Sequence, residues 1–217
     1  MSQLKAIVFD MDGLMVDSEP LSQQAWDEYL RPYGHKLSEE IVENIIGLRA
    51  DISTPYIKEL FNLPEPVPTI ISKRAAIYSQ IRAIGVPTMP GLQPLHAEIA
   101  RRNIPWGVAT SSPRTHAVEI LHQLGLQDRC QAIAAGDEVK QGKPNPEIYL
   151  LAAERLGIAP QDCLALEDSG PGSRAAVTAG MTVIAIPNRQ TKTADFSHVH
   201  YRYNALDEVL ANLDSWF

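Results

Sequence analysis

The chain has 217 residues, of which 45% are hydrophobic, and a formal net charge of −7. This length permits one large domain, or a core with a smaller second domain. The acidic balance argues against nucleic acid or an anionic membrane as the partner. No apolar stretch approaches the roughly 20 residues of a membrane helix, and two cysteines are too few for a disulfide scaffold. We therefore expect a soluble, cytoplasmic, monomeric protein.

The first predicted element is a strand over residues 4–9, whose apolar run ends in Asp10-Met11-Asp12-Gly13. Such a run is typical of a strand buried on both faces of a parallel sheet. Because ligands of open α/β sheets bind beyond the carboxyl ends of the strands, Asp10 and Asp12 stand where a ligand should be. Two carboxylates so close together favour a cation between them, and their oxygen ligands indicate Mg²⁺.

Helical patterns without a convincing strand occupy residues from about 18 to 88. The predicted helices run from Pro20 to Gly34, from Ser38, from Pro55, and through Ile70 to Ile84 after a proline-rich break at 62–68. Pro20 suits the first turn of a helix because the amide that it lacks has no partner there. Trp26 falls on the apolar stripe of the first helix, which favours a core position over a sugar platform.

From residue 91 onward, helix and strand alternate. The predicted elements are a helix at 91–102, a strand at 106–109, a helix at 112–125, a strand at 132–135, a helix at 145–157, a strand at 163–166, a helix at 171–180 and a strand at 182–186. This order predicts an α/β protein with a doubly wound parallel sheet. The core then comprises residues 1–17 and 89–217, and residues 18–88 form a helical cap that is inserted after the first strand.

Polar residues follow three further segments of the predicted core. They are Thr110-Ser111-Ser112, Lys143 and Glu167-Asp168-Ser169. Taken singly, they read as a helix cap, a solvated lysine and the start of a polar loop. Together with Asp10 and Asp12 they supply a nucleophile, a proton donor, hydroxyls, a cation and metal ligands. Phosphoryl transfer needs this set of groups.

Four segments resemble, in order, the four motifs of the haloacid dehalogenase-like hydrolases: residues 9–13, 108–112, 142–147 and 166–169. The resemblance implies a Rossmann-like core. The helical insertion resembles the small cap of the branch that contains β-phosphoglucomutases and sugar-phosphate phosphatases. Residues 10–14 together with 17–20 look especially like phosphatases of that branch.

The resemblance also implies roles for the site residues. Asp10 would attack phosphorus and form an aspartyl-phosphate, and Asp12 would protonate the leaving oxygen and then activate water. The implied ligands of Mg²⁺ are the Asp10 carboxylate, the Asp12 carbonyl oxygen and Asp168, with Glu167 as a further ligand or just behind it. The residues implied to bind or neutralise the phosphoryl group are Thr110, Ser111 and Lys143.

Two positions favour a phosphatase of a small phosphorylated metabolite, such as a sugar phosphate, over a β-phosphoglucomutase-like isomerase. Ser22 stands where the mutases have a histidine, and Pro113-Arg114 stands where they have a lysine and an asparagine. A non-catalytic sugar-phosphate sensor is a third reading, but it has no need for Asp12.

The remaining candidate substrate-binding residues are Arg49, Arg114 and Asn145. Arg49 follows Gly47-Leu48, and the alternative for it is a solvated side chain. None of the six histidines shows metal-ligand spacing, and we expect His198 and His200 to lie in a late edge strand.

Overall fold

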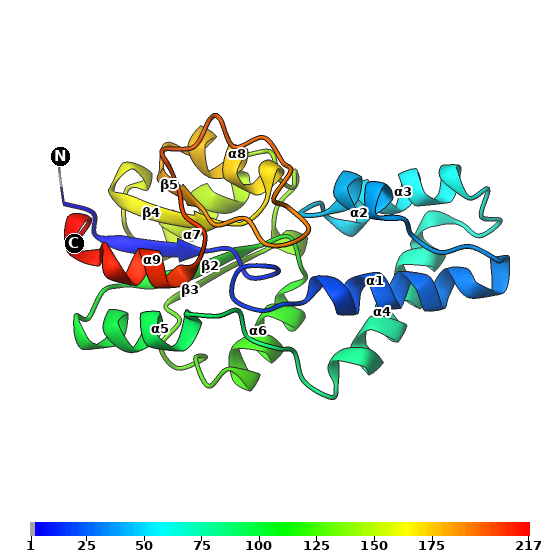
Figure 1. Ribbon diagram of the computed structural model, residues 1–217, viewed down its shortest axis with the longest axis horizontal. Helices are drawn as coiled ribbons and strands as arrows, with labels where there is room; N and C mark the ends of the chain where they lie inside the picture. The colour runs from blue at the N-terminus through cyan, green and yellow to red at the C-terminus, as the bar shows by residue number, and fades with distance from the viewer. Residues whose placement is uncertain (1–2) are drawn as a thin grey trace.

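The computed structural model describes residues 3–217 and shows two parts side by side (Figure 1). One part is a six-stranded parallel sheet with helices on both faces. The other consists of helices α1 to α4, which we call the cap; we call the sheet with α5 to α9 the core. The predicted α/β class with a doubly wound parallel sheet is therefore confirmed.

The strands follow the order β3-β2-β1-β4-β5-β6. Their bounds are β1 Ala6–Phe9, β2 Trp106–Thr110, β3 Ala132–Ala135, β4 Cys163–Glu167, β5 Thr182–Ala185 and β6 Tyr201–Arg202. The first strand lies in the middle of the sheet, where Ile7 is paired with Trp106 on one side and Leu164 on the other. Its carboxyl end therefore opens between those of β2 and β4.

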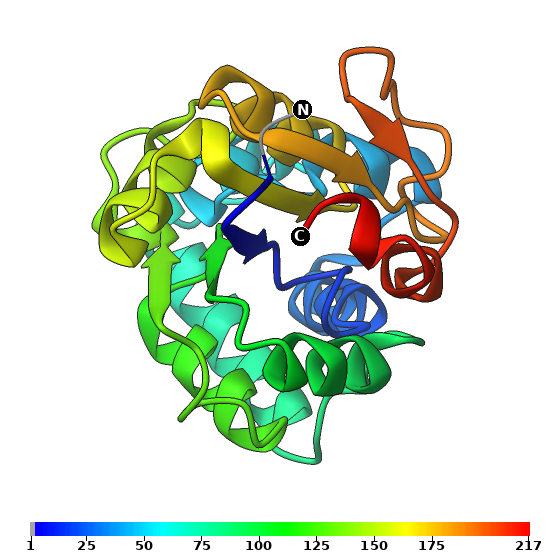
Figure 2. The same cartoon turned by 90° about the vertical axis from the view of Figure 1, so that its left-hand side faces the viewer.

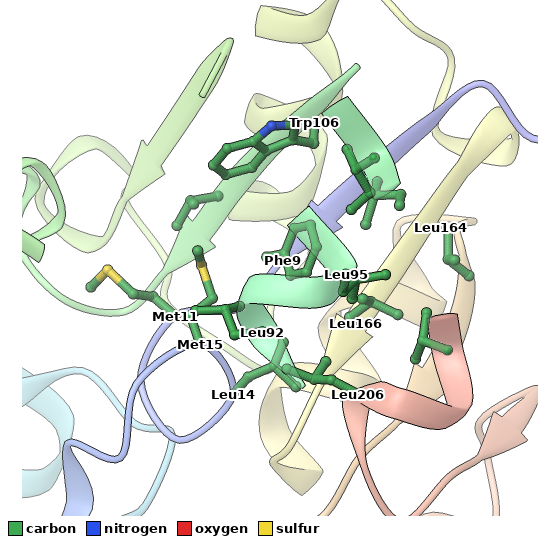
Figure 3. Packing of buried hydrophobic residues seen from close by; sticks show 14 of the residues in the cluster. Phe9, Met11, Leu14, Met15, Leu92, Leu95, Trp106, Leu164, Leu166 and Leu206 are labelled. Carbon is green, nitrogen blue, oxygen red and sulfur yellow. The ribbon is translucent and has the colours of Figure 1, made fainter. Parts of the chain in front are cut away.

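Helices cover the two faces of the sheet unequally (Figure 2). The core helices are α5 Leu92–Arg101, α6 Arg114–Gln123, α7 Glu147–Leu156, α8 Gly170–Thr178 and α9 Leu206–Ala211. Ile7 and Phe9 face α5, α6 and α9, where Figure 3 shows Phe9 packed with Leu95 and Leu166. Ala6 and Val8 face α7 and α8. This alternation buries both faces of β1, as its apolar run predicts.

The cap has an apolar cluster of its own, which includes Trp26, Leu30, Ile57 and Ile70. Its helices are α1 Glu19–Leu30, α2 Glu39–Ile45, α3 Ala50–Leu60 and α4 Val67–Arg82. Short 3₁₀ helices occur at Arg31–Tyr33, Gly136–Glu138, Pro160–Asp162 and Leu213–Ser215. Within residues 3–217, no helix has the length and apolar character to cross a membrane.

The two chain segments that join the cap to the core run beside each other. The amide of Asp17 donates to the carbonyl oxygen of Pro87 at 2.8 Å, and the amide of Met89 donates to that of Met15 at 2.9 Å. These segments are the expected connections near 15–19 and 86–91. We propose, on this basis, that residues 18–88 move as one unit relative to the core.

Three element predictions need correction. Helix α3 begins at Ala50, and Pro55 lies inside it rather than at its start. Helix α4 ends at Arg82, which leaves Ile84 outside and 94% exposed. His198 and His200 precede β6 instead of lying in it. His200 Nδ1 accepts the amide hydrogen of Val183 at 3.1 Å, so a side chain takes the place of a backbone pairing there.

Candidate active site

Asp10 and Lys143 form a buried ion pair at the carboxyl end of β1. Lys143 Nζ lies 2.5 Å from Asp10 Oδ1 and 2.6 Å from Glu167 Oε1. The amide of Asp10 is fixed by the carbonyl oxygen of Leu166 at 2.9 Å. Burial lowers the pKa of Lys143, but Asp10 and Glu167 more than offset this, so that its net pKa is raised and the amine stays charged. Asp10 and Lys143, which are 133 positions apart in sequence, therefore meet in the folded chain, as their joint assignment to one site predicts.

Glu167 is saturated by protein donors. Its Oε1 accepts hydrogen bonds from Lys143 and from the Tyr149 hydroxyl, the latter at 2.9 Å. Its Oε2 accepts the amide and hydroxyl hydrogens of Ser169 at 2.8 and 2.9 Å. A carboxylate has about four lone-pair positions, and all of them are used here. Of the two roles predicted for Glu167, these contacts favour a position just behind the metal, from which Glu167 holds Lys143.

Asp168 lies at the end of β4, beside the loop that follows β1. Its Oδ2 accepts a hydrogen bond of 2.8 Å from Asn188 Nδ2, which also donates to the Gly13 carbonyl oxygen at 3.1 Å. Gly13 has a φ of +86°, and a Cβ there would lie 2.4 Å from Asp168 Oδ2. The glycine after the two aspartates is thus required both by its backbone conformation and by the approach of Asp168.

Asp12 is surrounded by hydrogen-bond donors. Its Oδ2 accepts from the hydroxyls of Ser112 at 2.8 Å and Thr110 at 3.2 Å. His116 Nε2 lies 3.6 Å from its Oδ1. Burial raises the pKa of Asp12, but His116 together with the hydroxyls of Ser112 and Ser18 outweighs this, and the pKa lies below its usual range. Asp12 is therefore ionised in the free protein.

The donor set fits a single hard cation. Burial raises the pKa of both Asp10, to about 8, and Asp168, and in each case neighbouring carboxylates add to the effect of burial. Negative charge is thus in excess, although Lys143 is present. No group of three His, Cys, Asp or Glu side chains in residues 3–217 is arranged to hold a metal ion. Mg²⁺ needs no such group, because it commonly takes only one or two carboxylates and keeps several waters.

A cavity of about 400 Å³ lies between the cap and the aspartates. Asp10 and Asp12 line its floor, and Trp26 and Arg74 line it from the cap. The Arg74 guanidinium stacks over the rings of Trp26 and Tyr78, and its Nη2 donates to the Ser22 hydroxyl at 2.5 Å. Trp26 is buried as predicted for a core residue, yet it also forms part of the cavity wall.

Three of the predicted substrate-binding residues do not line this cavity. Arg49 donates to carbonyl oxygens of the core at residues 136 and 139. Arg114 pairs with Glu138 at 3.3 Å. Asn145 Oδ1 accepts the amide hydrogen of Glu147 at 3.0 Å, which fixes the start of α7. The structure therefore gives no support to their assignment as substrate contacts, because each polar group is engaged by the protein.

Thr110 and Ser111 differ from those three residues. Thr110 is fully buried, and its hydroxyl donates a hydrogen bond to Asp12, so it adjoins Asp12 without lining the cavity. Ser111 lines the cavity, and its hydroxyl donates to the carbonyl oxygen of Gly47 in the cap at 3.0 Å.

Four site residues were missed in the sequence: Glu19, Arg74, His116 and Asn188. His116 lies in the first turn of α6, four positions after Ser112, and both residues adjoin Asp12. Asn188 follows β5 by three positions, so it too lies beyond the carboxyl end of a parallel strand, where ligands are expected. Burial and the charge of Asp12 raise the pKa of Glu19 to about 7. Nothing in the sequence distinguishes Arg74 from a surface arginine.

Comparison with known proteins gives concordant results. The family model of the haloacid dehalogenase-like hydrolases matches residues 4–180. A phosphorylated carbohydrates phosphatase of Thermotoga maritima is 31% identical over 182 residues, which are 82% of each chain. A probable pseudouridine-5'-phosphatase of Drosophila melanogaster is 34% identical over 214 residues, 95% of this chain and 88% of that protein.

The same fold occurs in solved structures. The crystal structure of CbbY from Rhodobacter sphaeroides in complex with phosphate matches with a TM-score of 0.86 and 28% sequence identity. The match covers 97% of this chain and 99% of CbbY, so it includes the cap as well as the core.

Proposed function

The chain belongs to the haloacid dehalogenase-like hydrolases and is a phosphatase, and from this premise we propose that its substrate is a small phosphorylated metabolite, namely a sugar phosphate. We further propose that it uses Mg²⁺ and an aspartyl-phosphate at Asp10. The observation that carries the proposal is that Lys143 pairs with Asp10 while Asp168 lies beside Gly13, in the loop that follows Asp10. The cavity above them has the volume of a small-ligand site.

In the proposed reaction, Asp10 is the nucleophile and Lys143 neutralises charge on the phosphoryl oxygens. The carboxylate oxygen of Asp10 forms a bond to phosphorus while the bond from phosphorus to the sugar oxygen breaks. Asp10 and Asp168, with the Asp12 carbonyl, would hold Mg²⁺, which when bound shields the negative phosphoryl group from the attacking carboxylate. Glu167 keeps Lys143 oriented during this step.

Asp12 is proposed to give a proton to the leaving oxygen and then to take one from the attacking water. Its depressed pKa in the free protein means that it arrives ionised. The negative charge of a bound phosphate ester raises the pKa of a neighbouring carboxyl group. Substrate binding therefore favours the protonated form that an acid must have.

Two observations favour hydrolysis over phosphate isomerisation. The Ser22 hydroxyl, at the position of the mutase histidine, accepts a hydrogen bond from Arg74 and has no imidazole to offer. Arg114 pairs with Glu138 outside the cavity and holds no second phosphate there. An isomerase must hold a second phosphate group while the first is transferred. We therefore propose phosphate isomerisation only as the second candidate activity.

The proposal is tested by measuring phosphate release from a panel of sugar and nucleotide monophosphates. The reactions contain Mg²⁺, and matched samples contain EDTA. Release from one or more sugar phosphates that stops with EDTA supports the proposal. Phosphate release that persists in the presence of EDTA would contradict the proposed requirement for Mg²⁺. Conversion of a hexose 1-phosphate that starts only after addition of the hexose bisphosphate would favour the isomerase instead.

A further inference from the structure

The side chain of Arg49 crosses from the cap to a core loop. Its Nη1 donates hydrogen bonds of 2.8 Å to the carbonyl oxygens of both Gly136 and Val139, and its Nη2 lies 3.4 Å from that of Lys140. A single guanidinium thus collects three carbonyl oxygens from a stretch of five residues. Several carbonyl dipoles that point at one place make a receptor for a cation, and the planar fork of arginine suits them better than a lysine amine does.

Two glycines give the loop room for this side chain. A Cβ on Gly136 would lie 3.3 Å from Arg49 Cδ and only 2.1 Å from the Ser111 carbonyl oxygen. A Cβ on Gly142 would lie 3.4 Å from Arg49 Cβ. The Arg49 side chain is only 19% exposed in this position. The loop therefore fits the arginine in shape as well as in charge.

The cap prepares the guanidinium for this contact. Asp51, in the first turn of α3, accepts from Arg49 Nε at 2.6 Å and from Nη2 at 2.5 Å. This two-point pairing within the cap fixes the plane of the guanidinium. Two residues upstream, the Gly47 carbonyl oxygen accepts the Ser111 hydroxyl hydrogen at 3.0 Å. The segment at 47–51 is therefore fastened to two core loops.

The loop that Arg49 grips leads directly into Lys143. On its core side, the carboxylate of Glu147 accepts the amide hydrogens of Lys140 at 3.1 Å and Gln141 at 2.8 Å. The loop is thus held on two sides. Glu147 of the core binds its amides, and Arg49 of the cap binds its carbonyl oxygens. Displacement of the cap removes the second set of bonds, which lie only three to seven positions before the lysine that pairs with Asp10.

We propose that Arg49 is a positioning residue. With the cap against the core, it holds the loop at 136–142 in the form that places Lys143 on Asp10, and it thereby couples cap closure to the charge of the site. The inference rests on the proposed function in assigning Lys143 a part in phosphoryl transfer. It replaces the expectation that Arg49 touches the substrate.

The kinetic test uses Arg49→Ala and Arg49→Lys, with p-nitrophenyl phosphate and the best sugar phosphate of the panel as substrates. We expect kcat to fall at least about tenfold on both substrates with little change in KM, since a displacement of about 1 Å can cost 10²-fold. In Arg49→Lys, kcat should fall nearly as far, because one lysine amine cannot donate to three carbonyl oxygens and to both carboxylate oxygens of Asp51. A rise in KM confined to the sugar phosphate would overturn the proposal in favour of substrate contact.

Thr193→Val is the matched control. Thr193 also joins core to cap, through a hydrogen bond of 3.1 Å from its hydroxyl to Glu43, but it does not touch the loop at 136–142. Its removal should leave kcat and KM unchanged on both substrates. An equal loss of kcat in this variant would show that any cap contact matters, and would overturn a specific part for Arg49.

A second measurement does not depend on turnover. Hydrogen–deuterium exchange of the amides at 138–143 should be faster in Arg49→Ala than in the parent, and unchanged in Thr193→Val. Equal exchange in all three proteins would overturn the proposal. If the parent released phosphate from no ester, the proposed function would fail while the exchange result still decided the role of Arg49. Should Arg49→Ala not fold, Arg49→Lys and Asp51→Asn serve the same comparison.

Discussion

Lys143 Nζ lies 2.5 Å from Asp10 Oδ1, in a site where Lys143 is 1% and Asp10 5% exposed. The lysine also bonds Glu167, so one cation is shared between two buried carboxylates. Breaking such a pair by removing one partner usually leaves a buried charge without compensation. Here the loss of one carboxylate leaves the other in place. Substitutions at Asp10 can therefore separate chemistry from folding.

Asp10→Asn should abolish turnover and leave the protein folded. An amide oxygen can still accept a hydrogen bond from Lys143, but it does not attack phosphorus. We expect phosphate release to fall by on the order of 10⁴-fold or more, with a thermal melt that remains cooperative. Asp162→Asn removes a carboxylate from the exposed pair with Lys5 and should leave the rate unchanged. A rate for Asp10→Asn near that of the parent would disprove nucleophilic attack by this residue.

Asp12→Asn should separate the two halves of the proposed reaction. A good leaving group needs no acid, so p-nitrophenyl phosphate should still phosphorylate Asp10 and give a burst of nitrophenol. Turnover should then be slow, because the water lacks its base. Sugar phosphates, with poor leaving groups, should lose about 10²- to 10⁴-fold in the first step as well. Rapid-mixing measurements check both effects, and unchanged rates with sugar phosphates would count against the assignment.

Gly172→Ala should displace Glu167, the carboxylate that holds Lys143. A Cβ at Gly172 would lie 1.6 Å from Glu167 Oε1, so the carboxylate that holds Lys143 must move. We expect a loss of about 1–3 kcal/mol in the free energy of unfolding, as for other overpacked interiors, and a lower kcat. Gly170→Ala is the matched control in the same helix, since its Cβ would meet nothing closer than 3.7 Å. Equal stability and rate for the two variants would refute this reading.

The sequence predicts at which edge of the sheet a residue lies better than it predicts which partner its side chain contacts. Asp10 and Asp168 were expected to lie close together because the carboxyl ends of parallel strands share one edge of the sheet. Asp168 lies beside Gly13, in the loop after Asp10, and Lys143 pairs with Asp10. Arg49 and Arg114 stand near that edge too. Their guanidinium groups turn to carbonyl oxygens and to Glu138, partners that only the folded loop presents.

The residues that the sequence did not reveal depend on the cap as it packs on the core. Arg74 lines the cavity from helix α4 of the cap, and no motif near it in the sequence indicates this position. His116 was set aside for lack of metal-ligand spacing, yet its ring stacks on Tyr78 of the cap at 5.6 Å and adjoins Asp12. The predicted start of α3 at Pro55 was wrong because the first turn forms on the carbonyl oxygen of Arg49, which accepts the amide hydrogens of Ile52 and Ser53.

His96 should make stability depend on pH. Its ring stacks on Phe9 at 4.8 Å in the sheet core and is 3% exposed, and its Nε2 has no hydrogen-bond partner within residues 3–217. Burial lowers the pKa of His96 to about 4, against about 6.5 in an unfolded chain. Between these values the unfolded state binds more protons than the folded state. This contribution to stability is therefore complete above pH 6.5 and is lost as the pH falls toward 4.

His96→Leu should remove this dependence, because leucine takes up no proton in either state. The shift corresponds to about 3 kcal/mol across the whole window, at 1.36 kcal/mol per pKa unit. Urea denaturation of both proteins at pH 7, 5.5 and 4.5 gives the free energies to compare. The buried carboxylates respond to acid in both proteins, so their effect cancels in the difference. The parent should lose more stability than His96→Leu as the pH falls, and parallel curves would mean that His96 is not a buried neutral imidazole.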